Sequence, residues 1–490
     1  MLRELRELRE DAAGMAAALA RARWLRACGL SQQSTFLEML RAHRLAASAD
    51  GLAQVRETLE EALAEDPKRP ARIARLESLR SLLARVRALS LEPQAAQELF
   101  DLPQRGRVRL PGDAGLHGAV PEVAVRRELP LLASRERRAE MEAALADAEQ
   151  SADGVRSAVW EAAREARAQA ALVTPADASA WATRVLDGTD AIAGDLGAWL
   201  LERHTGARPG SLYRHDVLHL VHAPRCASAF PAGEMQRTVR RWAEMLRLDL
   251  SEVKVDDDDR PLKWPGTHAE PLDPPWEAGV ALLPAQGPRA LSSLLAGIGE
   301  ALLRLGPPSE APPEDLWLGD PAVRHGCAAL LGSLPLLWDW RRRCAKVELG
   351  RDDERAVAIA AVFDARIDAA TILAALQAEQ SGLGARAAAA HRDLYARATG
   401  AELPAGLALS GLDPWFEAFD RLRGRSLAAR ASAFLTDRYD EDWWRNPRSG
   451  ASLAGLWGRG GRPTFAELWA EMGGEPSADW IVQGLAAATQ

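Results

Sequence analysis

Three histidines in one short segment have the residue type and the spacing of a zinc-binding helix. His215 and His219 are four residues apart, and His222 follows seven residues after the first. Side chains at these intervals share one helix face, and two histidines four apart with an acid between them can bind zinc and activate a water molecule. The sequence therefore offers one metal-binding candidate that can be found from spacing alone.

Two features weaken this candidate. The acid is Asp216, which is one methylene shorter than the glutamate such motifs use. His215 and His222 would lie about 10 Å apart along the helix axis, whereas zinc bonds are about 2 Å long. We therefore keep two interpretations. The segment is either a partly exposed histidine-rich helix face, or a His215–His219 pair that a distant third ligand completes.

Other motifs with known chemistry are incomplete or missing from the sequence. The aspartates at 256–259 lack the alternating donors and the central glycine of a calcium loop, and we interpret them as the polar end of a strand. There is no phosphate-binding loop, dinucleotide fingerprint or serine nucleophile elbow. The four cysteines, Cys28, Cys226, Cys327 and Cys344, form no C-x-x-C pair, so we expect reduced and mostly buried thiols.

The composition indicates which elements position these side chains. The 490 residues are 47% hydrophobic and 27% charged, and Ala, Leu, Arg and Glu are frequent, as in mostly helical proteins that do not span membranes. The net charge of -8 gives no electrostatic footprint for nucleic acid. The N-terminus MLRELRELRED is charged, and no run reaches the roughly 18 apolar residues of a membrane helix. We expect a cytoplasmic protein with neither a nucleic-acid nor a membrane partner.

The pattern along the chain predicts two regions. Residues 1–120 read as an N-terminal helical cap that ends in a Pro/Gly-rich connection. Residues 121–490 read as a second helical region, interrupted at about 250–284 by short β-branched runs between Pro and Gly that predict a small sheet. An apolar helix follows at 287–305 and ends at Gly306.

This order of elements, together with local sequence, resembles the thimet oligopeptidase and oligoendopeptidase F family of zinc peptidases. YRHDVLHLVHAPRCASAFPAGEM is similar to the family's segment before a Phe-Pro step, and VKVDDDDRPLKWPGTHAEP is similar to its approach strand. The stretch that begins LDPWFEAFDRLRGRS is similar to its last substrate-binding helices. The resemblance covers roughly residues 130–490, and the cap more weakly. It implies a mainly α, two-lobed, zincin-like (gluzincin) fold with a deep cleft and a small β-sheet.

The same resemblance implies that the catalytic groups have been lost. The family carries His-Glu-x-x-His on the helix at 287–305, where two histidines bind zinc and the glutamate is the general base. The corresponding residues here are Ala296, Gly297 and Glu300. The family's third ligand corresponds to His325, which lies 325 − 296 = 29 positions after Ala296. We expect Glu300 and His325 to form a buried hydrogen bond or ion pair, with a metal-binding role as the alternative.

A second loss concerns the transition state. The family supplies tyrosines from its C-terminal part to stabilise the oxyanion, and a donor of this kind typically contributes a few kcal/mol. Phe416 and Asp420 occupy the corresponding positions in WFEAFDRLRG. Phenylalanine cannot donate a hydrogen bond, and an ionised aspartate would repel the developing charge. These positions are therefore expected to be vestigial.

Three hypotheses about function follow. The first is a catalytically inactive peptidase-like protein, or pseudopeptidase, that needs no cofactor and binds a peptide or protein partner. The second is an active zinc oligopeptidase with relocated ligands drawn from His215, His219, His325 and Glu300. The third is a non-catalytic helical scaffold whose groove has collapsed. Nothing in the sequence indicates the partner's identity or the oligomeric state.

Overall fold

The N-terminal region is a helical layer with its own apolar core. The computed structural model describes residues 2–31, 35–65, 70–110, 119–208 and 210–489. The layer consists of α1 (Leu2–Ala27), α2 (Phe36–Ala42), α3 (Arg44–Ala47), α4 (Ala49–Glu65), α5 (Pro70–Leu91) and α6 (Pro93–Arg105). Leu8, Met15, Phe36 and Leu83 are buried in its core. A short antiparallel ladder of β1 (Arg107–Val108) and β2 (Val120–Pro121) closes the connection to the rest of the chain.

Helices also dominate the part of the chain that leads to the sheet. They are α7 (Glu122–Glu128), η1 (Leu129–Leu131), α8 (Arg135–Gln150), α9 (Asp153–Gln169), α10 (Ala178–Ala191), η2 (Ile192–Gly197), α11 (Ala198–Thr205), α12 (Arg214–His222), η3 (Pro224–Ala229) and α13 (Ala232–Leu246). The three histidines of the zinc-like segment all lie on α12. The predicted amphipathic helices therefore form.

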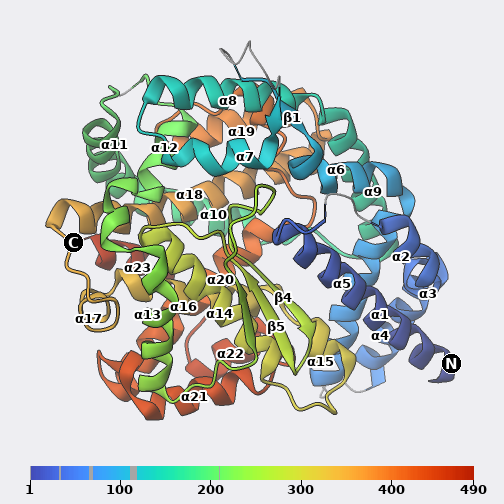
Figure 1. The fold of residues 1–490 in the computed structure, drawn as a ribbon. Coiled ribbons are helices and arrows are strands. Elements are labelled where there is room, and N and C mark those ends of the chain that lie inside the picture. The colour runs from blue at the N-terminus through green and yellow to red at the C-terminus, as the bar shows by residue number, and fades with distance from the viewer. Residues whose placement is uncertain (1, 32–34, 66–69, 111–118, 209, 490) are drawn as a thin grey trace.

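A three-stranded sheet lies within the region where the sequence predicted one. It consists of β3 (Val253–Asp256), β4 (His268–Asp273) and β5 (Glu277–Ala281), in the order β3-β5-β4. The middle strand, β5, is parallel to β3 and antiparallel to β4. Figure 1 shows α1 of the cap running beside β4. The chain then enters α14 (Pro288–Leu305), which packs against β5 and corresponds to the apolar helix predicted at 287–305.

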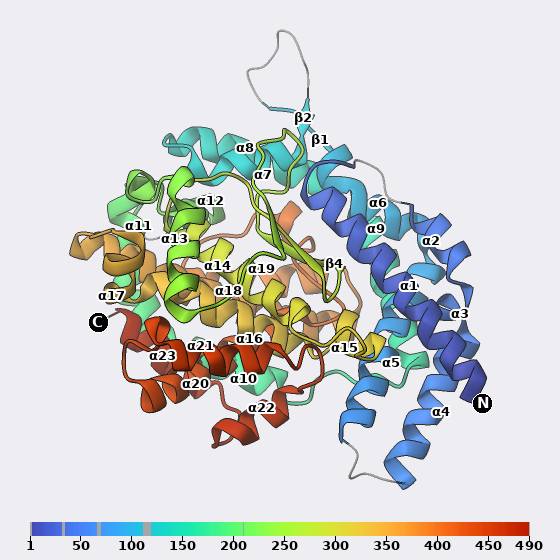
Figure 2. The same cartoon turned by 60° about the horizontal axis from the view of Figure 1, so that its bottom comes forward.

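The C-terminal half is again helical and surrounds α14. It contains α15 (Pro313–Trp317), α16 (Pro321–Gly332), η4 (Leu334–Leu336), α17 (Trp338–Trp340), η5 (Arg341–Ala345), α18 (Arg351–Ser381), α19 (Ala385–Thr399), η6 (Ala405–Leu407), α20 (Glu417–Tyr439), η7 (Trp443–Arg445), α21 (Pro447–Trp457), α22 (Phe465–Met472) and α23 (Asp479–Thr489). Figure 2 shows α20 to α23 gathered on the side away from α8. The largest apolar core lies here, and Trp443 and Trp444 are buried in it.

Glycines allow three central helices to approach one another closely. A β-carbon on Gly299 of α14 would lie 2.4 Å from the Cys327 carbonyl oxygen of α16. A β-carbon on Gly424 of α20 would lie 2.6 Å from the β-carbon of His325, also on α16. Real β-carbons essentially never come this close to another heavy atom. The backbones of α14, α16 and α20 therefore pack directly against one another, and this fixes the side chains that project from them.

Ion pairs join the cap to the main body. Arg9 of α1 and Arg75 of α5 pair with Glu314 and Asp315 of α15. Arg23 of α1 makes two hydrogen bonds to Glu270 of β4, at 2.5 and 2.9 Å. The architecture is mainly helical with a three-stranded sheet and a two-stranded ladder, which agrees with the predicted mainly α fold with a small sheet.

Two further observations concern the whole of the described chain. All four cysteines are buried and unpaired, as their scattered spacing predicted. None of the helices in the described ranges combines the length and the apolar character that crossing a membrane requires.

Candidate binding cavity at the peptidase-like helix

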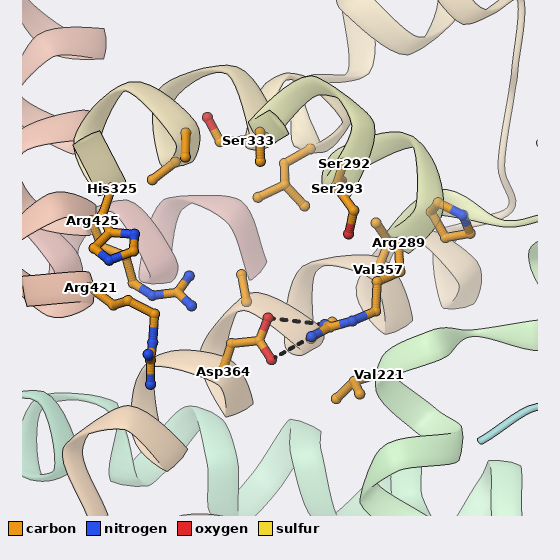
Figure 3. Close-up of a pocket in the computed structure, with 18 residues that line it drawn as sticks. Val221, Arg289, Ser292, Ser293, His325, Ser333, Val357, Asp364, Arg421 and Arg425 are labelled. Atoms are coloured by element: carbon orange, nitrogen blue, oxygen red, sulfur yellow. Dashed lines mark hydrogen bonds and ion pairs between the residues drawn. The ribbon is translucent and has the colours of Figure 1, made fainter. Parts of the chain in front are cut away.

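A cavity of about 270 Å³ lies between α14, α16, α18 and α20, and also touches α12. Much of its wall consists of small side chains, contributed by Ala296, Ala328, Ala329, Ala360 and Ala361. Serines line the part of the wall near Arg289, and Figure 3 shows their side chains among the charged groups. The short side chains leave the space open, and its polar groups come from three arginines, three serines, one histidine and one aspartate.

The charged groups lie at two ends of this cavity (Figure 3). At one end Arg289 of α14 forms a two-point ion pair with Asp364 of α18, at 3.0 and 3.1 Å. Burial opposes ionisation of Asp364, but Arg289 and Arg425 outweigh it and hold the pKa of this carboxyl below its usual value. At the other end lie His325, Arg421 and Arg425.

Arg421 and Arg425 of α20 share one carboxylate. Asp368 accepts two hydrogen bonds from Arg421, at 2.9 and 2.7 Å, and this carboxylate raises the pKa of Arg421 further. Arg425 reaches the same carboxylate only at 3.5 Å. The Arg421 side chain is 40% exposed. The cavity is therefore open to water and has a cationic end.

Two of the positions expected to be vestigial metal ligands lie together at this cavity. Ala296 and His325 both line it. Burial, reinforced by Arg324, Arg421 and Arg425, holds the pKa of His325 well below its usual value, so the imidazole is neutral at pH 7.

Glu300 pairs mainly with a residue that the sequence reasoning did not single out. Its carboxylate lies 3.2 Å from Arg324 and 3.9 Å from His325. The second distance is too long for a hydrogen bond. The expected hydrogen bond or ion pair between Glu300 and His325 is therefore replaced by the shorter ion pair between Glu300 and Arg324.

The position that corresponds to the general base does not line the cavity. Gly297 is buried against the sheet, and a β-carbon there would lie 2.7 Å from Val280 and 2.8 Å from Thr267. Non-bonded carbon atoms normally stay about 3.5–4.0 Å apart. No side chain fits at this position without movement of the neighbouring residues.

Phe416 and Asp420 do not join this cavity. They line a separate depression together with Trp181, Phe419 and Phe465. Burial raises the pKa of Asp420 to about 7, and Arg423 lies 3.5 Å from its carboxylate.

The register of α20 explains why different residues face the cavity. Successive residues of a helix are rotated by about 100°, so Arg421 and Arg425 point elsewhere than Asp420 does. In the sequence, the signal for this face is the spacing of four residues between Arg421 and Arg425.

The histidines of α12 do not converge on one point. His215 is buried, and its Nδ1 lies 2.8 Å from Glu142. His219 bonds the Pro130 carbonyl oxygen at 2.9 Å, and His222 bonds the carbonyl oxygen of Leu218 at 2.8 Å. His215 is buried while His219 and His222 are partly exposed, so the partly exposed face that we expected holds for two of the three histidines.

The residues present do not fit a zinc ion. Across the part of the chain that the structure describes, no three His, Cys, Asp or Glu side chains come close enough together to hold one metal. At the cavity, Ala296 has no donor atom and Glu300 is engaged by Arg324. A hydrolytic zinc centre needs about three protein ligands and an open position.

A second cavity of about 300 Å³ adjoins the first. The two share Arg289 and Ser293 in their linings, and the second extends past His222 and Trp264 towards Arg127. Together they follow the N-terminal half of α14 on both sides of the Arg289–Asp364 ion pair. The two cavities therefore adjoin one another along this helix.

Comparison with solved structures identifies the architecture. A protein assigned as oligoendopeptidase F from Bacillus anthracis superimposes with a TM-score of 0.60 and 14% identity, over 90% of this chain and 82% of that one. PZ peptidase A superimposes with a TM-score of 0.62 and 13% identity, over 100% of this chain and 96% of that one. Trypanosoma cruzi metallocarboxypeptidase 1 superimposes with a TM-score of 0.58 and 11% identity, over the full length of both chains. No protein-family model and no curated protein matches the sequence.

These likenesses define a class of fold. The chain has the architecture of the helical gluzincin-type peptidases, which includes oligoendopeptidase F and the M32 carboxypeptidases. The predicted resemblance is therefore confirmed for the fold. At 10–14% identity the comparison carries no conclusion about activity.

Proposed function

We propose that this protein is a pseudopeptidase: it binds a peptide, or an extended segment of a partner protein, in the cavity at α14 and does not hydrolyse it. One observation carries the proposal. The cavity persists beside Ala296 and His325 and is lined by charged groups, while the donor set around it suits no zinc ion.

The cavity also argues against the scaffold hypothesis. In a collapsed groove, apolar side chains would fill the space between the four helices. Here alanines and a glycine line much of it, and the Arg421 and Arg289 side chains keep 40% and 35% of their surface exposed. Maintaining ionised groups around a cavity has a desolvation cost that a merely structural core avoids. This supports binding over a purely structural role.

The buried thiols support a cytoplasmic setting for this function. Unpaired cysteines persist in reducing compartments, and all four cysteines of this chain are unpaired. We propose that the partner is met there and that binding needs no cofactor.

A fluorescence-anisotropy titration with a library of labelled peptides tests the proposal, followed by mass spectrometry of the same peptides after prolonged incubation. We expect saturable binding and intact peptides. Cleaved peptides would instead identify a working peptidase, and a complete lack of binding would identify a scaffold.

A cavity-filling variant locates the binding site. Ala361→Leu places three more carbon atoms in the cavity and should abolish binding. Ala454→Leu makes the same change at an exposed position of α21 and should leave binding unchanged. Equal affinities of the two variants would place the ligand elsewhere.

A further inference from the structure

Arginines outnumber the carboxylates that pair with them around the cavity. Arg289, Arg421 and Arg425 contribute three guanidinium groups, and Asp364 and Asp368 contribute two carboxylates. The neutral His325 adds no positive charge. Glu417 lies just outside, on the same helix as Arg421, and pairs with Arg85 at 3.8 Å. The three arginines therefore share two carboxylates, Asp364 and Asp368, within ion-pair distance.

Arg425 is the least tightly paired of the three arginines. Arg289 and Arg421 each donate two short hydrogen bonds to a carboxylate, whereas Arg425 makes a single contact at 3.5 Å. Within the described chain, the buried Nε of Arg425 has no hydrogen-bond acceptor. The Arg425 side chain as a whole is 29% exposed, so its terminal nitrogens, rather than the buried Nε, are the donors that a ligand in the cavity can reach.

The geometry suits a carboxylate in particular. A guanidinium presents its donors in a planar fork that matches the two oxygens of a carboxylate. His325 stands beside Arg425 (Figure 3), and because its Nε2 accepts from Arg324 at 3.3 Å, the neutral ring has its Nδ1–H left to donate.

The size of the cavity limits what enters it. At about 270 Å³ it is smaller than most pockets for drug-sized ligands, which measure about 300–1,000 Å³. One residue of a peptide, with its adjoining backbone, is a suitable occupant. The neighbouring cavity beyond Arg289 gives the rest of the peptide a path along α14.

We infer that this cavity binds an acidic peptide, with one carboxylate of the peptide seated against Arg425 and His325. The inference rests on the proposed function, because it names the ligand class of the same cavity. The carboxylate comes either from an Asp or Glu side chain or from the C-terminus of the peptide.

Three matched peptides separate these sources. The first carries a central Glu and an amidated C-terminus, the second replaces Glu with Gln and stays amidated, and the third carries Gln and a free C-terminus. Tighter binding of the first peptide than of the second, by about tenfold or more, identifies a side-chain carboxylate, as expected for a charge-assisted hydrogen bond. Tighter binding of the third than of the second identifies the C-terminus. Equal binding of all three overturns the inference but leaves peptide binding intact, whereas no binding at all overturns the proposed function as well.

Substitution of Arg425 assigns the effect to this site. Arg425→Gln should weaken the preferred peptide about tenfold or more and leave the amidated Gln peptide unchanged. Arg438→Gln removes an exposed arginine at the far end of α20 and is the matched control, expected to have no effect. Circular dichroism of both variants checks the fold. Unchanged selectivity in a folded Arg425→Gln variant would contradict the assignment, and the comparison of the three peptides on the unaltered protein does not depend on any variant.

Discussion

Replacing Gly299 by alanine should destabilise the protein, although alanine is the better helix former. Gly299 lies in the middle of α14, where this helix crosses α16. An added β-carbon would meet the carbonyl oxygen of Cys327 at 2.4 Å and its carbonyl carbon at 2.9 Å. Because the opposing atoms belong to the backbone of a helix, no side-chain rotation relieves the contact. One of the two helices has to move.

The size of the effect follows from two opposing contributions. Alanine favours the helix over glycine by about 0.8–1 kcal/mol. Overpacking of a filled core costs about 1–3 kcal/mol, and the approach here is about 1 Å shorter than an ordinary contact of about 3.5 Å. We take the upper end of the cost and expect a net loss of about 2 kcal/mol. Gly455 of α21 is exposed and would place its β-carbon in open space, so Gly455→Ala should gain about 0.5–1 kcal/mol.

Urea unfolding followed by tryptophan fluorescence measures both variants against the unaltered protein. The account predicts a lower midpoint for Gly299→Ala and a slightly higher one for Gly455→Ala. If Gly299→Ala were as stable as Gly455→Ala, the close crossing of α14 and α16 would be refuted. The idea that small residues hold α14 in place would then fail with it.

Three other perturbations have defined outcomes. The triple variant Ala296→His, Gly297→Glu, Glu300→His should be less stable in urea and hold no stoichiometric zinc by metal analysis. The reason is that a side chain at position 297 has no room beside Val280, and that Arg324 loses its carboxylate partner. Tight binding of one zinc per chain would contradict this prediction. His215→Ala should cost about 1–3 kcal/mol in urea unfolding, because buried Glu142 loses a hydrogen-bond partner, while zinc content stays the same; an unaltered midpoint would count against it. Asp420→Asn tests the carboxyl whose pKa is raised to about 7. Since this pKa exceeds that of the unfolded chain, the native state gains stability from the proton below about pH 4 and loses it as the pH rises through 7. As the pH rises from about 4 to 7, the unaltered protein should lose unfolding free energy that the variant keeps, so the difference between them should shift in favour of the variant. Parallel profiles of unfolding free energy against pH would contradict this.

The sequence predicted the elements well because their signals are local. Apolar periodicity and the bounding Gly306 mark α14, and β-branched runs between Pro and Gly mark the sheet. The placement of Ala296 near His325 depended on the family resemblance, since no local pattern brings two helices together.

The surroundings of the site could not be predicted in the same way. Whether Asp420 or Arg421 faces the cavity depends on the rotation of α20, and a difference of one residue turns the side chain by about 100°. The competition between Arg324 and His325 for Glu300 depends on side-chain reach across two helices. The close fit of Gly297 against Val280 depends on how the sheet docks on α14. All three are tertiary properties, and composition and spacing contain little information about them.

Our central proposal is that the cavity in this peptidase-like fold does not catalyse zinc-dependent hydrolysis of peptides. Metal analysis after zinc loading and gel filtration, combined with a peptide-library cleavage assay with and without a chelator, tests it most directly. The account predicts far less than one zinc per chain and no chelator-sensitive cleavage. One tightly bound zinc per chain together with chelator-sensitive cleavage would contradict it.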